Sequence, residues 1–265
     1  IMIQKIIKIL VNPLIIIEKI RIYLEKKKYN ANIFLDKQNK IFSELNLSRK
    51  EGYEKYQKII STYSFINDEM SSEHQVFFSS LSMSKEFDIK DILEIGTWDA
   101  KNSFLLSVLF KDSNIDTIDL KKDHKIFTDF YNRSHKLDKF IKERDEIIKK
   151  EKRINFQELN SLRLYNHPKK YDLIWIDGAH GYPVVCMDII NSLKILNSNG
   201  IIMCDDVFIN QIKSDGIYQS VATFETLQEL KNENIIDYKL IYKRLTKEHN
   251  FSEKSRKYVA VVSLK

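Results

Sequence analysis

Short apolar runs alternate with amphipathic stretches through the second half of the chain. Five of these runs have the length and the apolar content of buried strands, although the third is weak: Asp91–Gly96, Ile115–Leu120, Arg153–Phe156, Tyr171–Asp177 and Gly200–Val207. A strand that is apolar on both faces must be covered on both faces. The runs therefore predict an α/β fold in which helices cover both sides of a mostly parallel sheet.

The segments between the runs keep helical spacing. Ser103–Phe110 is predicted to be a buried helix, and another begins at Pro183 and stops at Asn197–Gly200. Residues 136–153 are highly charged but place apolar residues along one helical face, which predicts a helix inserted between the second and third strands. Its role stays open between a lid, a substrate wall, a dimer contact and a solvated surface helix.

The C-terminal tail has a different pattern. After a predicted helix around Tyr218–Lys231, the segments Tyr238–Lys243 and Lys257–Leu264 look like strands, with no long crossover between them. They are expected to pair antiparallel at the edge of the sheet. The fold prediction is thus a Rossmann-like, seven-stranded, mostly parallel sheet with an antiparallel C-terminal edge strand and an N-terminal helical extension.

Residues 1–28 predict two amphipathic helical pieces, divided at Asn12 and Pro13. Charges interrupt the apolar stripe, which argues against a membrane span. Packing on the body or a homo-oligomer interface is favoured, and a helix lying on a membrane surface is the alternative. The expected organisation is an extension over residues 1–29, a helical region over 30–90 and the main domain over 91–265, which carries the insert.

The formal net charge of +6 suggests a nucleic-acid partner until its position is considered. Residues 1–28 hold seven basic and two acidic residues, so the remainder is close to neutral and offers no nucleic-acid footprint. Cys186 and Cys204 lack the spacing of a zinc or redox motif, which predicts buried free thiols. No pattern of a cleavable signal peptide is present, so a cytoplasmic location is expected, with membrane association as an option.

The loop after the first predicted strand carries the first candidate ligand contacts. Gly96 permits a tight turn before a helix whose first amides are free to bind a ligand. Trp98 and Lys101 interrupt the pattern G-x-G-x-x-G, which argues against NAD and FAD. Asp119 closes the second strand 23 positions after Gly96, where an acidic residue can bind both hydroxyls of a ribose. Glu94 would orient the loop or reach an amino group, and Asn160 and Ser161 could face an adenine.

The motifs EIGTWDAKNS, DLIWIDGAH and GIIMCDDV, together with Asp119, resemble the class I S-adenosylmethionine (SAM)-dependent methyltransferases. Within that class they are similar to the macrocin-type sugar and macrolide O-methyltransferases and, more distantly, to catechol-type enzymes. The resemblance covers roughly residues 91–207 and departs from the pattern at Ala100, where a glycine is usual. It implies SAM as cofactor. The expected cofactor contacts are Glu94, Gly96, Thr97, Trp98, Ser103, Asp119, Leu120, Asn160, Ser161 and Asp177.

Three carboxylates end the fourth and fifth strands: Asp177, Asp205 and Asp206. Carboxylates that converge repel one another unless a cation compensates, and Mg²⁺ prefers such oxygens. The resemblance implies the same metal ligands. The alternative is that these residues only form turns or helix caps.

The expected chemistry is methyl transfer to a hydroxyl of a small polar metabolite, with a sugar or sugar precursor preferred. The metal would position the acceptor and lower its pKa. His180 is the candidate general base beside Asp177, because an imidazole can accept a proton near neutral pH, and His74 is a secondary candidate. Ala179 stands where the macrocin-type enzymes have a further acid, so the residue that matches the family's base is missing. Two alternatives remain: a metal-independent methyltransferase acting on nitrogen or a phosphate-type oxygen, and a non-catalytic nucleotide-binding scaffold protein.

Overall fold

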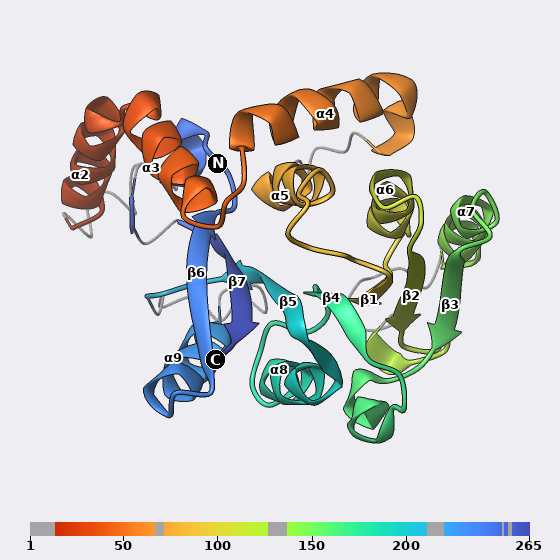
Figure 1. Ribbon diagram of the computed structural model, residues 1–265. Helices are drawn as coiled ribbons and strands as arrows, with labels where there is room; N and C mark the ends of the chain where they lie inside the picture. The colour runs from red at the N-terminus through yellow and green to blue at the C-terminus, as the bar shows by residue number, and fades with distance from the viewer. Residues whose placement is uncertain (1–13, 67–71, 127–136, 211–219, 251, 254–255) are drawn as a thin grey trace.

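The computed structural model describes residues 14–66, 72–126, 137–210, 220–250, 252–253 and 256–265. A seven-stranded sheet of order β3-β2-β1-β4-β5-β7-β6 lies at its centre (Figure 1). The strands are β1 (Asp91–Ile95), β2 (Asn114–Asp119), β3 (Ile154–Glu158), β4 (Tyr171–Ile176), β5 (Leu196–Val207), β6 (Ile236–Tyr242) and β7 (Tyr258–Leu264). This is the Rossmann-like fold predicted from the sequence.

One strand of the sheet is reversed. Strands β3, β2, β1, β4 and β5 pair in parallel, and β7 pairs antiparallel with both β5 and β6. The predicted antiparallel pair is confirmed, and β7 lies between β5 and β6, so β6 forms the edge. Because β6 runs parallel to β5 while β7 opposes it, the end of β6 and the start of β7 both lie at the carboxyl edge of the central strands.

Helices cover both faces of the sheet (Figure 1). They are α2 (Leu14–Lys28), α3 (Ala31–Ser43), α4 (Arg49–Thr62), α5 (Glu73–Leu81), α6 (Lys101–Leu109), α7 (Leu137–Ile148), α8 (Val184–Ile195), α9 (Ala222–Asn232) and α10 (Lys247–Asn250), with the 3₁₀ helices η1 (Ser64–Ile66) and η3 (Ser161–Asn166). Alternate strand residues point to opposite faces. Leu173 and Trp175 thus join the core under α4, α5 and α6, while Ile174 and Ile176 join the core over α8 and α9.

The inserted helix α7 is packed on the domain. Arg144 is buried, and its guanidinium lies 4.1 Å from the ring centroid of Phe156 in β3. Ile147 and Ile148 contact the core. Of the roles left open by the sequence, a merely solvated surface helix is therefore excluded.

The N-terminal region is helical, as the sequence predicts, and α3 and α5 are anchored to β6. The buried side chain of Gln38 donates to the carbonyl of Tyr242 at 3.1 Å and accepts from its amide at 2.9 Å. Glu73, at the start of α5, donates its amide to the carbonyl of Lys243 at 2.9 Å and pairs with Arg49 at 2.6 Å. These bonds satisfy the end of the edge strand and fix α5 over the carboxyl edge of the sheet.

Helix α2 differs from the others because its apolar side is exposed. Ile16, Ile17, Ile20, Tyr23 and Leu24 are 43% to 62% exposed. The prediction that the apolar side of α2 packs on the rest of the protein is therefore wrong. The predicted break at Asn12 and Pro13 lies outside the described residues.

Two further predictions concern a membrane span and the cysteine residues. Within the described ranges, we find no helix with the length and hydropathy needed to traverse a bilayer. Cys186 and Cys204 are both free, as predicted, and Cys204 is buried, whereas Cys186 is only partly buried.

Candidate active site

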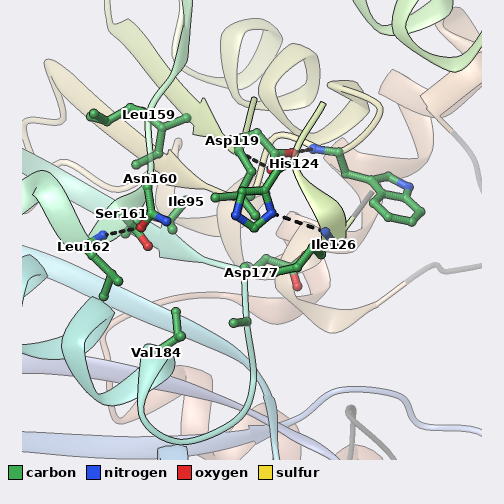
Figure 2. A pocket seen from close by; sticks show the side chains of 16 residues that line it. Ile95, Asp119, His124, Ile126, Leu159, Asn160, Ser161, Leu162, Asp177 and Val184 are labelled. Carbon is green, nitrogen blue, oxygen red and sulfur yellow. Dashed lines mark hydrogen bonds between the residues drawn. The ribbon is translucent and has the colours of Figure 1, made fainter. Parts of the chain in front are cut away.

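A cavity of about 160 Å³ opens at the carboxyl ends of β1, β2, β3 and β4 (Figure 2). Ligands of open parallel sheets bind at this edge, where the strand order reverses. Seven of the ten residues predicted from the sequence as cofactor contacts line it: Gly96, Trp98, Asp119, Leu120, Asn160, Ser161 and Asp177. The motifs at the ends of separate strands are thus brought together around one pocket.

The loop between β1 and α6 depends on left-handed backbone. Gly96 has φ 101°, and a Cβ there would lie 2.3 Å from the carbonyl oxygen of Asp177, so only glycine fits. Trp98 and Ala100 have φ 50° and 62°. Ala100 thus adopts the conformation that the usual glycine would adopt with less strain, and the departure noted in the sequence leaves the turn intact.

Asp119 connects this loop to the end of β2. Its carboxylate accepts the amide of Trp98 at 2.9 Å and that of Leu120 at 2.7 Å, and its side chain lies beside the pocket (Figure 2). Asn160 caps η3 by accepting the amide of Leu162 at 2.9 Å. Both side chains are held by backbone groups and remain at the cavity wall.

Glu94, Thr97 and Ser103 are buried and do not line the cavity. Glu94 is 1% exposed and accepts from Asn102 at 2.8 Å and from Thr117 at 2.7 Å, and also from Ser103. Burial raises the pKa of Glu94 to about 7, although these bonds act in the opposite direction. Of the two roles considered for Glu94, the geometry favours orientation of the loop.

Several residues of the cavity wall were not predicted from the sequence. His124 and Ile126 follow β2, and Leu159 and Val184 complete the apolar lining (Figure 2). They lie in turns and element ends of ordinary composition, so only the fold brings them to the site. Helix α7 also reaches the site through Phe140, whose ring contacts Trp98 at a centroid distance of 5.5 Å.

Beside the cavity, the structure gathers the three predicted carboxylates together with two lysines. Lys243, directly after β6, donates from Nζ to one oxygen of Asp205 and one of Asp206. Lys257, directly before β7, donates to the other oxygen of Asp206 at 2.7 Å. Neither lysine was predicted. The available signal was their position at the flanks of the two tail strands, which the topology brings to the carboxyl edge.

Charge is balanced within this cluster. Burial alone would raise the pKa of Asp205, but the Lys243 ammonium group lowers it well below its usual range. The same carboxylates raise the pKa of Lys243 despite its burial. Burial, and then the negative charge of Asp205, raise the pKa of Asp177. Lys243 and Lys257 together thus pair with both oxygens of Asp206 and one oxygen of Asp205.

Two histidines border the cluster. His180 Nε2 lies 3.6 Å from Asp177 Oδ1, and burial lowers its pKa. His74, at the start of α5, bonds through Nδ1 to Ser72 Oγ at 2.8 Å and lies 4.6 Å from the ring of Trp175. Burial lowers the pKa of His74 to about 4. Both imidazoles are therefore neutral near pH 7.

The carboxylates do not fit a divalent cation in this arrangement. The Lys243 ammonium group bonds to one carboxylate oxygen of Asp205 and to one of Asp206. A metal ion held by these two residues would compete with Lys243 for the same carboxylates. Asp205 Oδ1 is buried and has no hydrogen-bond partner among the residues that the structure describes, but a single such oxygen is no metal site. In the ranges that the structure describes, no group of three His, Cys, Asp or Glu side chains is placed to hold a metal ion. The expected magnesium site at Asp177, Asp205 and Asp206 thus finds no support.

Comparisons with known proteins agree with the fold. Residues 93–207 match the family model described as a methyltransferase domain. A putative O-methyltransferase from Klebsiella pneumoniae superposes with a TM-score of 0.50 at 17% identity, covering 71% of this chain and 78% of that one. The SAH-bound methyltransferase PaMTH1 of Podospora anserina gives 0.50 at 19% identity, covering 81% and 88%. No curated protein sequence matches the chain.

The sheet order, the glycine turn after β1 and the matched residues define a class I methyltransferase fold. The matched segment runs from β1 to the end of β5 and is similar to a methyltransferase domain.

Proposed function

We propose that the protein is an O-methyltransferase that moves the methyl group of SAM to a hydroxyl of a small polar molecule. The observation that carries the proposal is the adjacency of two sites: the cavity with Gly96 and Asp119 on its wall, and the cluster around Asp177 and His180. A fold neighbour described as a putative O-methyltransferase supports oxygen as the acceptor atom.

In this proposal, the ends of β1, β2 and β3 hold the donor. Asp119 accepts the ribose hydroxyls, the amides of the Gly96 loop approach the methionine part, and Asn160 and Ser161 face the adenine. All of these residues line the cavity. Asp177, which lines the cavity and also borders the carboxylate cluster, then lies between donor and acceptor.

The chemical step needs a base and an aligned acceptor. The hydroxyl oxygen attacks the methyl carbon, the carbon–sulfur bond breaks towards the neutral thioether, and the hydroxyl proton goes to His180. A neutral imidazole accepts a proton, and burial keeps His180 in that form. Since the methyl carbon is already activated by the sulfonium, positioning and proton removal are the enzyme's main tasks.

Magnesium has no part in this proposal, because Lys243 binds the oxygens that a metal would need. A sugar or sugar precursor remains the preferred acceptor, with the motif resemblance as its support. Transfer to nitrogen or to a phosphate-type oxygen is the second candidate. The pairing of Lys243 with the carboxylates is as compatible with this reaction as with transfer to a hydroxyl. Product analysis by mass spectrometry distinguishes these acceptors.

Calorimetry with SAM tests the donor site. The wild-type protein is expected to bind SAM, and Asp119→Asn to bind about 10- to 100-fold more weakly, since a hydrogen bond to a charged group contributes about 1.5–3 kcal/mol. The matched control is Asp88→Asn, at a side chain that is 82% exposed. Absence of SAM binding by the wild type, or equal binding by Asp119→Asn, would contradict the assignment.

We also propose that α2 attaches the protein to an anionic membrane surface. Its apolar side chains are exposed, and Leu14–Lys28 holds five basic and two acidic residues, which suits acidic headgroups. A second copy of the chain is the competing occupant, and the homo-oligomer expected from the sequence remains a prediction.

A further inference from the structure

We propose that Lys243 takes the place of a divalent cation at the carboxyl edge of the sheet, so that the acidic cluster excludes metal ions. Lys243 would then be a positioning residue, which fixes Asp205 and Asp206 beside the acceptor. The positioning role beside the acceptor rests on the proposed function, whereas the exclusion of metal ions does not. Its test needs neither donor nor acceptor.

The first argument is the geometry of the cluster. Lys243 is 4% exposed, and its ammonium group lies between two carboxylates that are themselves buried. A metal ion bound by the same carboxylates would have to displace both of its charge-assisted bonds. Such a displacement would leave a buried ammonium group without its partners, which is strongly unfavourable.

The second argument is that the backbone holds Lys243 in place from both sides. Its amide donates to the carbonyl of Lys257 at 3.0 Å, and its carbonyl accepts the amide of Glu73 at 2.9 Å. Glu73 is in turn fixed by Arg49 at 2.6 Å and by Gln38 at 3.1 Å. The side chain therefore starts from a rigid point at the end of β6.

The third argument is the charge balance. Lys243 pairs with one oxygen of Asp205 and one of Asp206, and Lys257 pairs with the other oxygen of Asp206. The repulsion between carboxylates that led to the expectation of a metal is thus already removed by the protein. An added Mg²⁺ would bring excess positive charge and would have to lose part of its hydration shell.

One consequence concerns the reaction. A lysine belongs to the chain and cannot be removed by a chelator. Methyl transfer should therefore persist in EDTA, and donor binding should not change when Mg²⁺ is added.

The test is a titration of the protein with Mn²⁺, in which electron paramagnetic resonance measures the free ion. The wild type is expected to show no saturable binding. Lys243→Met is expected to gain one saturable site, because it exposes the carboxylates to solvent ions. The gained site should disappear when Asp205→Asn is added to Lys243→Met.

Two variants serve as controls. Lys243→Arg retains a cation between the carboxylates and should still exclude Mn²⁺. Lys239→Met removes another lysine of the same strand, whose Nζ bonds to Glu44, and should behave as the wild type. Circular dichroism checks that each variant is folded.

Saturable Mn²⁺ binding by the wild type that is lost in Asp205→Asn would overturn the inference. A folded Lys243→Met that gains no site would also overturn it. If Lys243→Met does not fold, the wild type and Lys243→Arg decide, since exclusion by both supports the inference and binding by either contradicts it. Each of these results is independent of SAM binding, so failure of the proposed function is recognised separately.

Discussion

Glu94 is a carboxyl group in the interior of the domain, directly below the loop that forms the cavity. Its three donors come from the start of α6 and from β2. Glu94 therefore connects the start of α6 to β2, while Asp119 connects the loop to the end of β2 through the amide of Trp98. The conformation of the loop at the cavity thus depends on Glu94, a buried residue that does not line the cavity.

The raised pKa of Glu94 predicts a pH-dependent stability. In the unfolded chain the pKa is 4.5, and in the folded protein burial raises it to about 7. Between these values the folded state retains a proton that the unfolded state has lost, so this stabilisation is complete below pH 4.5 and is lost as the pH rises to 7. The expected loss is about 3 kcal/mol.

Glu94→Gln removes this titration. Urea unfolding across the window should show the wild type losing stability relative to the variant as the pH rises. The difference between the two proteins also cancels the opposite contribution of His74, whose pKa burial lowers to about 4. Glu54→Gln, at an exposed position, is the control. A constant difference between wild type and Glu94→Gln would contradict the prediction.

The candidate-site residues that could be predicted from the sequence are those that lie at the end of a central strand. Gly96, Asp119 and Asp177 follow strongly apolar runs, so their position at one edge of the sheet was predictable. Lys243 and Lys257 follow and precede the tail strands, and their approach to Asp205 and Asp206 depends on β7 lying between β5 and β6. Strand order at that end has no local signal, so the lysines were missed and a metal was inferred.

At the scale of elements, α3 is attached to the sheet through one side chain. Gln38 forms with Tyr242 the pair of bonds that a further strand would form, and so occupies the end of the edge strand. Edge strands with free backbone groups invite pairing with other chains. This contact both anchors the N-terminal region and blocks that pairing.

Gln38→Leu is expected to destabilise the protein by about 1–3 kcal/mol, because the buried amide and carbonyl of Tyr242 lose their partners. The free energy of unfolding in urea measures this effect. The matched control is Asn39→Leu, which makes a similar change at an exposed neighbour. Equal stability of the two variants would show that the Gln38 bonds do not anchor α3.

Element types followed from periodicity, whereas boundaries did not. The sequence predicted that the preceding helix stops at Asn197–Gly200 and that the strand begins at Gly200, but β5 begins at Leu196, because pairing to β4 starts there, opposite Tyr171. The inserted helix ends at Ile148, several residues before the predicted limit. In both cases the partner strand or the packing surface sets the limit, and a single sequence does not describe either.

At the scale of the whole molecule, the methyltransferase domain and α2 present different surfaces. Helices cover both faces of the sheet of the domain, and α2 lies beside α3, away from the sheet (Figure 1). The apolar side chains of α2 are exposed. An exposed apolar stripe beside basic residues is typical of helices that lie on membranes.

Co-sedimentation with vesicles tests this role of α2. The wild-type chain should bind vesicles of anionic lipid more strongly than neutral vesicles, and salt should weaken the binding. The double variant Ile17→Asp and Ile20→Asp should lose it. Ile190→Asp, at a similarly exposed isoleucine of α8, is the control. If vesicle binding is unchanged and light scattering instead shows a dimer that the double variant dissociates, the partner of α2 is a second copy.

The place of β7 has a consequence for synthesis of the protein on the ribosome. β7 pairs with both β5 and β6, so the sheet stays open on one side until residues 258–264 have left the exit tunnel. Lys257 arrives immediately before them, and until then Asp206 lacks one of its two cations. A nascent chain stalled before this point would hold the whole segment matched to the methyltransferase domain together with an unfinished sheet.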